Sequence, residues 1–260
     1  MTRVLAIANQ KGGVAKTTTS HTLAVALARA GRHVLLVDLD PQACLTFSAG
    51  LDPERLGLSV HDAMLGRNKL DDITVELADL VLAPATIDLA STEQQLLART
   101  GRDFALRDAL QSGSVAFDDV IIDCAPSLGV LTVNALTAAH EVIVPLQCEA
   151  LSHRGVAQLL DTIAQVRRYT NPHLVVRGVV ATMFDTRTKH SREVLDDVRT
   201  RFGLEVLDPP VPKSVRFAEA PLRGITILDH APGSPGAQAY ETIARRLLEQ
   251  PSASELNDGR

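Results

Sequence analysis

Along the chain, short runs of apolar residues alternate with longer stretches in which apolar residues recur at helical spacing. Continuous apolar runs are typical of strands buried in a parallel sheet, and the stretches between them are typical of helices that cross over its faces. Gly31 is expected to end the first helix, and Thr92 to cap the second. Strands are predicted at residues 4–8, 34–37, 80–83, 120–122, 142–145 and 174–180. Helices are predicted at residues 17–30, 91–110, 128–139, 151–169, 191–202 and 236–249.

This alternation predicts an α/β fold, a mostly parallel, twisted sheet with helices on both faces. The chain has 260 residues, of which 45% are hydrophobic but only 3% are aromatic, so the core is expected to be aliphatic. We interpret residues 1–250 as a single domain. Residues 251–260 are small and polar and are expected to form a flexible C-terminal tail.

The first predicted strand leads into a glycine-containing loop and then into a helix, which is the context of a phosphate-binding loop. Backbone N–H groups of such a loop and the helix N-terminus favour a bound phosphate. Lys16 is expected to neutralise the β- and γ-phosphates, and Thr17 to ligate Mg²⁺. The usual pattern has glycine where Gln10 and Ala15 stand, and we expect Ala15 to be tolerated with a negative φ. The loop consists of Lys11, Gly12, Gly13, Val14, Ala15, Lys16, Thr17 and Thr18.

Carboxylates follow two of the predicted strands. Asp38 and Asp40 come after the strand at 34–37, and Asp123 comes directly after 120–122. Residues at the carboxyl ends of strands in a doubly wound sheet line the ligand crevice. Asp123 is therefore expected to hold Mg²⁺ through a water, as a Walker B aspartate does, and Asp38 and Asp40 are expected near the phosphates.

Six segments together resemble the ParA/Soj family of chromosome- and plasmid-partition ATPases. This family is part of the deviant Walker A group of P-loop NTPases, which also includes MinD. The resemblance extends over roughly residues 3–249. It implies a P-loop ATPase with ATP/ADP and Mg²⁺ as cofactors, which hydrolyses ATP slowly, as a switch. The segments are 8–19, 34–42, 84–90, 121–129, 144–149 and 215–221.

The resemblance also implies roles for single residues. Lys11 is similar to the family's signature lysine, which reaches the partner's phosphates in a nucleotide-sandwich dimer; its sequence position alone is equally compatible with a solvated loop lysine. Asp40 resembles the carboxylate that positions the attacking water, and Asp38 resembles a residue that supports the metal shell. Pro212 and Lys213 resemble the segment that packs on adenine.

The resemblance further implies that the ATP-bound homodimer binds double-stranded DNA without sequence preference and is released when a ParB-like activating protein stimulates hydrolysis. The implied location is the cytoplasm, on the nucleoid. Since the net charge is −5, DNA contact would depend on a local basic patch. Residues 185–223 hold eight Lys or Arg and seven Asp or Glu, so an ordinary solvated surface remains an alternative. The candidate DNA contacts are Arg187, Lys189, Arg192, Arg216 and Arg223.

Two functions of related proteins remain as alternatives. A membrane switch of the MinD type needs a basic amphipathic C-terminal helix. The last predicted helix is instead followed by Pro251 and an acidic polar stretch, so no membrane contact is expected. An iron–sulfur reductase of the nitrogenase iron-protein type needs cysteines that pair across a dimer. Cys44, Cys124 and Cys148 are widely spaced, which favours buried thiols in a reducing cytosol.

Overall fold

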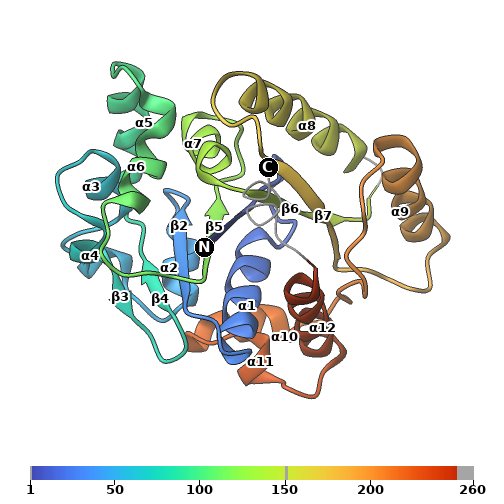
Figure 1. Cartoon of the computed structure of the whole chain (residues 1–260). Helices are drawn as coiled ribbons and strands as arrows, with labels where there is room; N and C mark the ends of the chain where they lie inside the picture. Colours follow the sequence, from blue (N-terminus) through green and yellow to red (C-terminus); the bar gives the residue numbers. More distant parts are fainter. Residues whose placement is uncertain (1, 150–151, 251–260) are drawn as a thin grey trace.

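A seven-stranded sheet forms the centre of the computed structural model, which describes residues 2–149 and 152–250 (Figure 1). Neighbouring strands are parallel, except that β3 and β4 at one edge are antiparallel. Across the sheet the order is β3 (Val75–Glu76), β4 (Val81–Ala83), β2 (Val34–Leu39), β5 (Asp119–Cys124), β1 (Arg3–Ile7), β6 (Glu141–Gln147) and β7 (Val175–Thr182).

Every predicted strand is present, with its ends shifted by no more than two residues. The predicted mostly parallel α/β sheet is therefore confirmed. Strand β3 was not predicted, because two residues are too few to show an alternating pattern. The single domain expected over residues 1–250 stays a prediction, and the polar tail expected at 251–260 lies outside the described residues.

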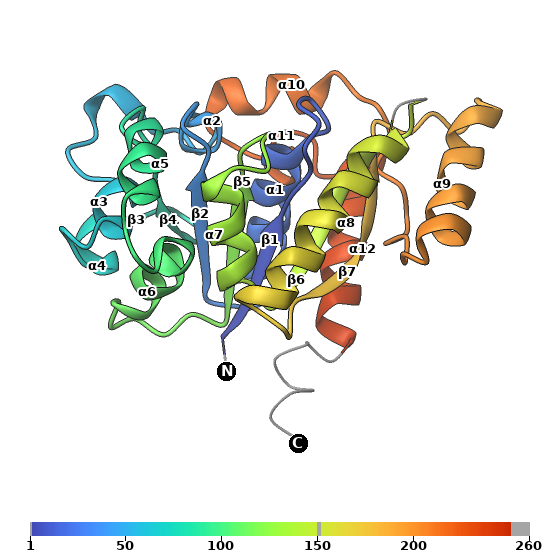
Figure 2. The same cartoon turned by 90° about the horizontal axis from the view of Figure 1, so that it is seen from above.

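Helices cover both faces of the sheet, as Figures 1 and 2 show. The first face carries α3 (Val60–Met64), α4 (Leu70–Ile73), α5 (Leu89–Leu97), α6 (Ala105–Gln111), α7 (Val130–Ala138), α8 (Ser152–Tyr169) and α9 (Lys189–Phe202). The second face carries α1 (Lys16–Arg29), α2 (Cys44–Ser48), α10 (Arg216–Glu219), α11 (Ile227–His230) and α12 (Pro235–Glu249). No helix within the described part of the chain is long and apolar enough to cross a membrane.

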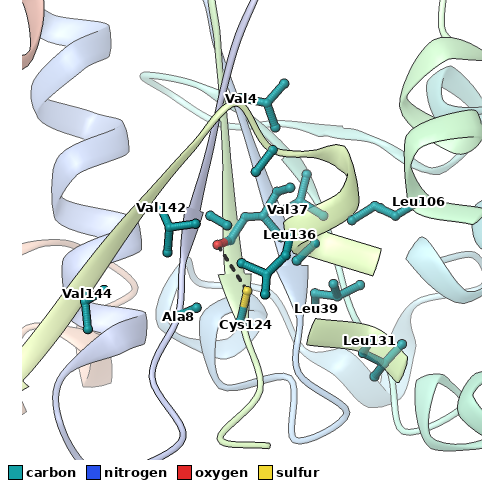
Figure 3. Close-up of a cluster of buried hydrophobic side chains, with 14 of the residues drawn as sticks. Val4, Ala8, Val37, Leu39, Leu106, Cys124, Leu131, Leu136, Val142 and Val144 are labelled. Carbon is teal, nitrogen blue, oxygen red and sulfur yellow. Dashed lines mark hydrogen bonds between the residues drawn. The ribbon is translucent and has the colours of Figure 1, made fainter. Parts of the chain in front are cut away.

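Each face of the sheet packs an aliphatic core against its helices. Figure 3 shows part of the first core, a cluster of buried side chains to which Val37 of β2, Val142 of β6 and Leu136 of α7 belong. The second core joins the other side of the same strands to α1 and α12, and its largest fully buried side chain is Tyr240. Because the strands are buried on both faces, their apolar runs are continuous, which is why they could be found in the sequence.

One predicted helix is wrong. Residues 91–110 do not form a single helix: α5 ends at Leu97, and α6 begins at Ala105 after a turn in which Gly101 has φ 74°. Thr92 does not cap α5 but lies buried within it, where its Oγ1 is 2.7 Å from Nδ1 of His61. The left-handed glycine interrupts the helix and redirects the chain.

Candidate active site

The predicted phosphate loop lies at the carboxyl edge of the central strands. β1 ends at Ile7, the loop follows, and α1 begins at Lys16. In the pairing of β1 with β5, Ile7 is opposite Asp123, and in the pairing of β5 with β2, Asp123 is opposite Asp38. The register of the sheet therefore brings the loop and both carboxylates to one place.

The backbone at Ala15 contradicts the expected negative φ. Its φ is 63° and its ψ 36°, in the left-handed region. For a residue with a Cβ this conformation costs roughly 1–2 kcal/mol, whereas Gly13, with φ 73°, avoids that cost. The loop thus keeps at position 15 the backbone geometry of a glycine, although the residue is alanine.

Two further non-glycine residues in the described ranges have a positive φ. Ala43, with φ 51°, follows β2, and Met183, with φ 48°, follows β7. Like Ala15 after β1, both lie beyond the carboxyl end of a parallel strand. Strained backbone persists where surrounding structure fixes it, and it tends to gather at functional sites. Here it marks the carboxyl edge of the sheet.

Lys16 extends back across its own loop. Its Nζ donates a hydrogen bond to the backbone oxygen of Lys11 at 3.2 Å, and the residue is buried. Burial lowers the pKa of Lys16, and the nearby Asp123 carboxylate partly opposes that shift. A buried ammonium whose acceptor is a neutral carbonyl gains from a bound anion, such as a phosphate.

Asp123 is buried at the end of β5 with one carboxylate oxygen unused. Oδ1 accepts a hydrogen bond from Oγ of Ser20 at 2.8 Å, and the Thr17 side chain also donates to the carboxylate. Within the described residues, Oδ2 has no hydrogen-bond partner. Burial, reinforced by the Asp38 carboxylate, raises the pKa of Asp123 to about 7. A carboxylate oxygen and a hydroxyl together suit Mg²⁺, which prefers oxygen ligands.

The protein alone would supply only part of a magnesium shell. Between residues 2–149 and 152–250, no three His, Cys, Asp or Glu side chains are grouped so that they could hold a metal ion. Mg²⁺ in nucleotide sites typically takes one or two protein ligands and completes its shell with phosphate and water. Thr17 and Asp123 therefore fit a metal ion that arrives with a nucleotide.

Asp38 is fully buried, and its carboxylate bonds to the chain that follows it. Oδ2 accepts hydrogen bonds from the backbone N and from Oγ1 of Thr46, at 2.8 and 2.7 Å, and Oδ1 accepts one from the backbone N of Asp40 at 3.2 Å. Burial raises the pKa of Asp38 to about 6, against the effect of the Thr46 bonds. Asp40, half-buried, accepts from the backbone N of Gln42 at 3.0 Å. Asp38 thus organises the turn that presents Asp40.

Lys11 directs its side chain away from its own loop. Its Nζ lies 2.5 Å from Oε2 of Glu149, and the two side chains are 35% and 52% exposed. Its backbone N–H donates to Oδ1 of Asn9 at 3.0 Å, and Nδ2 of Asn9 donates to the backbone oxygen of Pro145 at 2.7 Å. The start of the loop is therefore tied to β6, while the ammonium of Lys11 stays near the surface.

Four polar residues at this edge had no predicted role: Asn9, Ser20, Thr46 and Glu149. Asn9 and Glu149 stand in segments that carry the family resemblance, which was the one signal available. Ser20 lies inside a helix and Thr46 in a short segment without a clear pattern. Ser20 bonds to Asp123, 103 residues away, and Thr46 to Asp38, 8 residues away, and only the folded chain shows these contacts.

Pro212 and Lys213 lie beside the end of β7. Pro212 forms an isolated bridge with Phe184, and the backbone N of Lys213 donates to the Phe184 oxygen at 3.4 Å. Just before this point, Oγ1 of Thr182 donates to the backbone oxygen of Val14 at 3.0 Å. The segment expected to pack on adenine therefore lies next to a strand end that contacts the phosphate loop.

The five candidate DNA contacts are exposed and fall into two groups. Figure 2 shows α10 over the edge that carries the loop, and α9 beyond β7. The first group lies at the start of α9 and just before it. Two of its residues form ion pairs with neighbouring carboxylates, at 2.9 and 3.3 Å, which reduces the positive charge of this group. The first group is Arg187, Lys189 and Arg192, of which Arg187 and Lys189 are paired; the second, in α10 and the 3₁₀ turn Pro221–Arg223, is Arg216 and Arg223.

A groove of about 1260 Å³ opens beside Thr17. It runs between the segment around α2 and the turn Pro221–Arg223. Phe47, Ile87 and Leu222 line it and are 54%, 70% and 77% exposed. An apolar groove therefore lies directly beside the residue expected to ligate Mg²⁺.

Residues 2–176 match a family model described as AAA domain. The chromosome partitioning protein ParA of Caulobacter vibrioides is 44% identical over 252 residues, which are 95% of this chain and 94% of ParA. The sporulation initiation inhibitor protein Soj of Bacillus subtilis is 41% identical over 251 residues, which are 95% of this chain and 98% of Soj.

A solved structure has the same fold. The crystal structure of cobyrinic acid a,c-diamide synthase from Mycobacterium smegmatis with bound ADP and magnesium matches with a TM-score of 0.86 at 51% sequence identity, covering 100% of this chain and 97% of that one. The expected P-loop fold, the ATPase activity and the ATP/ADP and Mg²⁺ cofactors are confirmed at the level of the family. The chain belongs to the ParA/Soj family of P-loop ATPases.

Proposed function

We propose that the chain is a DNA-segregation switch. Its ATP-bound form closes into a sandwich homodimer that binds nonspecific double-stranded DNA, and ATP hydrolysis opens the dimer. The observation that carries the proposal is that the side chains of the two loop lysines point in different directions. Lys16 is buried and reaches across its own loop, whereas Lys11 directs its ammonium outward to Glu149. An exposed ammonium beside the loop is suited to the phosphates of a second copy.

The nucleotide would bind as in other P-loop ATPases. Backbone N–H groups of residues 11–18 surround the β-phosphate, and Lys16 neutralises the β- and γ-phosphates. Thr17 and Asp123 would hold Mg²⁺, Asp123 through a water, and Asp38 would support that shell from the next strand. Mg²⁺ supplies neutralisation of phosphate charge. Pro212 and Lys213 pack on adenine.

Hydrolysis depends on Asp40 and on a lysine delivered from the partner. Asp40 orients the attacking water, from a turn that Asp38 fixes through the Asp40 backbone. Lys11 would leave Glu149 when the dimer closes and place its charge on the transferred phosphate of the other copy, as an arginine finger does in trans. Each site is then incomplete without the second chain, so hydrolysis and dimer opening are coupled.

DNA binding is assigned to the two exposed basic groups at α9 and α10. A dimer doubles both groups, which makes binding dependent on ATP and sensitive to salt. A ParB-like activating protein stimulates hydrolysis and releases the DNA. A basic segment of that partner would suit the net charge of −5. The corresponding location is the cytoplasm, on the nucleoid.

Amide formation is a second candidate, because a neighbour at 51% identity is named cobyrinic acid a,c-diamide synthase. An amidase half-reaction that takes nitrogen from glutamine needs a cysteine thiolate. Cys124 and Cys148 are buried as expected, which raises the pKa of both, that of Cys148 to about 11. Cys44 is exposed, contrary to expectation, and partial desolvation together with Asp40 raises its pKa. No cysteine is thus activated. ATP consumption that rose only with cobyrinic acid and an ammonia source would favour this candidate instead.

DNA co-sedimentation tests the proposed function directly. In Mg-ATP, the Asp40→Ala protein should pellet with a nonspecific DNA duplex, and in Mg-ADP it should not. Replacing both Arg216 and Arg223 by Ala should reduce the slope of log K against log salt by about 2–4, since each lost phosphate contact changes the slope by about 0.9. The matched control replaces Arg245 and Arg246 of α12, which are equally exposed. Equal loss of DNA binding in both pairs would refute the assigned surface.

A further inference from the structure

Thr46 of α2 has a position that the roles above do not explain. It is fully buried and lies between the Asp38 carboxylate and the turn at residues 84–88. We propose that Thr46 is a positioning residue for ATP hydrolysis, which acts on Asp40 through Asp38. This inference rests on the proposed function, because it takes Asp40 as the residue that orients the attacking water.

The hydroxyl of Thr46 has a partner on each side. Oγ1 donates to Oδ2 of Asp38 at 2.7 Å and accepts from the backbone N–H of Ala85 at 2.9 Å. A hydroxyl carries a single proton and rotates to suit its partners. Because the Ala85 N–H occupies a lone pair, the proton must point at Asp38. The backbone N–H of Thr46 donates to the same oxygen at 2.8 Å, so two donors fix one side of the carboxylate.

The other side of the carboxylate holds the turn that carries Asp40. Oδ1 of Asp38 accepts from the backbone N–H of Asp40 at 3.2 Å, and the Asp40 carbonyl accepts from the N–H of Ala43 at 2.8 Å. Ala43 is left-handed, with φ 51°, a conformation that costs an alanine about 1–2 kcal/mol. A strained turn keeps its shape only while surrounding bonds hold it. The bonds from Thr46 to Asp38 supply that restraint.

The same contact gives a role to the segment at 84–90, which carries family resemblance but no group placed at the phosphates. Its Ala85 N–H holds Thr46, and its Pro84 oxygen accepts from the N–H of Val60 at 2.9 Å, which anchors the segment to α3. Ile87 of this segment and Phe47, next to Thr46, both line the groove beside Thr17. The segment thus forms the wall that supports the Asp38–Thr46 pair.

A purely structural role for Thr46 makes a different prediction. Loss of its hydroxyl leaves a buried carboxylate and a buried N–H each short of one partner, which lowers stability under either interpretation. Only a positioning role also lowers kcat while nucleotide binding is kept, because the ground-state contacts proposed for ATP lie on the loop and at Pro212 and Lys213, and not on Asp40.

The test compares Thr46→Val, which keeps the shape, with Thr46→Ser, which keeps the hydroxyl. Thr92→Val is the matched control, since Thr92 is equally buried in α5 and its hydroxyl contacts His61, not the site. Thr46→Val should lower kcat at least tenfold, with KM for ATP and Kd for Mg-ADP within threefold of the parent. Thr46→Ser should keep at least a third of kcat, and Thr92→Val should lower Tm but keep kcat.

A kcat of Thr46→Val within twofold of the parent would overturn the inference, as would an equal loss of kcat in Thr46→Ser. If Thr46→Val does not unfold cooperatively, Thr46→Ala gives the same comparison below its own Tm. Asp40→Ala, measured in parallel, distinguishes a failure of the role proposed for Asp40 from a failure of the role proposed for Thr46. Normal hydrolysis by Asp40→Ala refutes the assigned role of Asp40, whereas an inactive Asp40→Ala beside a fully active Thr46→Val refutes only the role of Thr46.

Discussion

Asn9 and Ser20 each place a polar side chain between segments far apart in the sequence. Asn9 links the start of the phosphate loop to β6, and Oγ of Ser20 reaches both the Lys16 carbonyl at 3.0 Å and Asp123. Buried polar groups of this kind are stable only when their partners are in place. They therefore fix the loop against the sheet before any nucleotide binds.

His21 is a buried histidine on the second turn of α1. Burial lowers its pKa to about 4 from an ordinary value of 6.5, against a smaller opposing effect of Asp229. The folded chain thus holds His21 neutral at a pH where the unfolded chain protonates it. Its contribution to stability is complete above pH 6.5 and is lost as the pH falls toward 4.

The His21→Gln variant should be less sensitive to acid than the parent. Between pH 7 and pH 4.5, His21 should account for about 2.5 kcal/mol of the parent's loss in unfolding free energy, and the variant should lack that part. Urea unfolding at both pH values measures it. An identical loss in parent and variant would show that His21 does not titrate as its burial requires.

Positions of single residues can be predicted from the sequence where one short motif determines the local geometry. Lys16, Thr17 and Asp123 could be placed because a strand end, a glycine turn and a helix start fix them together. The positive φ of Ala15 could not be predicted, because alanine rarely adopts it and the sheet imposes it. The partners of Lys11 and Asp38 depend on contacts 138 and 8 residues away.

Among the elements, α2 and the turn Pro221–Arg223 meet through two glycines. Gly50 and Gly224 have φ of 89° and 68°, and a Cβ on Gly224 would lie 2.7 Å from Cα of Gly50. Both glycines line the groove beside Thr17. This close approach positions α2, which also carries Thr46.

Gly224→Ala should therefore destabilise the protein by about 2 kcal/mol or more, from the left-handed φ and the backbone contact together. Gly233→Ala is the control, because its Cβ would meet nothing within 4 Å and its φ is not positive. Urea unfolding should show a change within about 0.5 kcal/mol for the control. Similar losses in both variants would mean that the glycine contact does not constrain α2.

The long elements were predictable and the short ones were not. Strands buried on both faces give continuous apolar runs, and helices such as α8 and α9 show clear amphipathic spacing. Helices of four or five residues, such as α2, α10 and α11, have too few turns to show a period. Tertiary contacts determine them. Residues of α2 line the groove beside Thr17, and Phe217 of α10 and Ile227 of α11 line a smaller pocket next to it.

At the scale of the whole molecule, the negative net charge means that DNA could be bound only at a local basic surface. The chain is acidic overall, yet α10, with exposed Arg216, lies over the edge that carries the phosphate loop, and α9 lies beyond β7 (Figure 2). Closure of two copies at this edge would bring four basic groups to one assembly. The proposed trans role of Lys11 and the proposed DNA binding both depend on ATP-dependent dimerisation.

Size-exclusion chromatography with light scattering measures this dimerisation. Asp40→Ala should have the mass of two chains in Mg-ATP and of one chain in Mg-ADP. The Lys11→Ala, Asp40→Ala double variant should bind ATP but keep the mass of one chain. A single-chain mass for Asp40→Ala at saturating Mg-ATP would refute ATP-dependent dimerisation, and a two-chain mass for the double variant would refute the role of Lys11 in it.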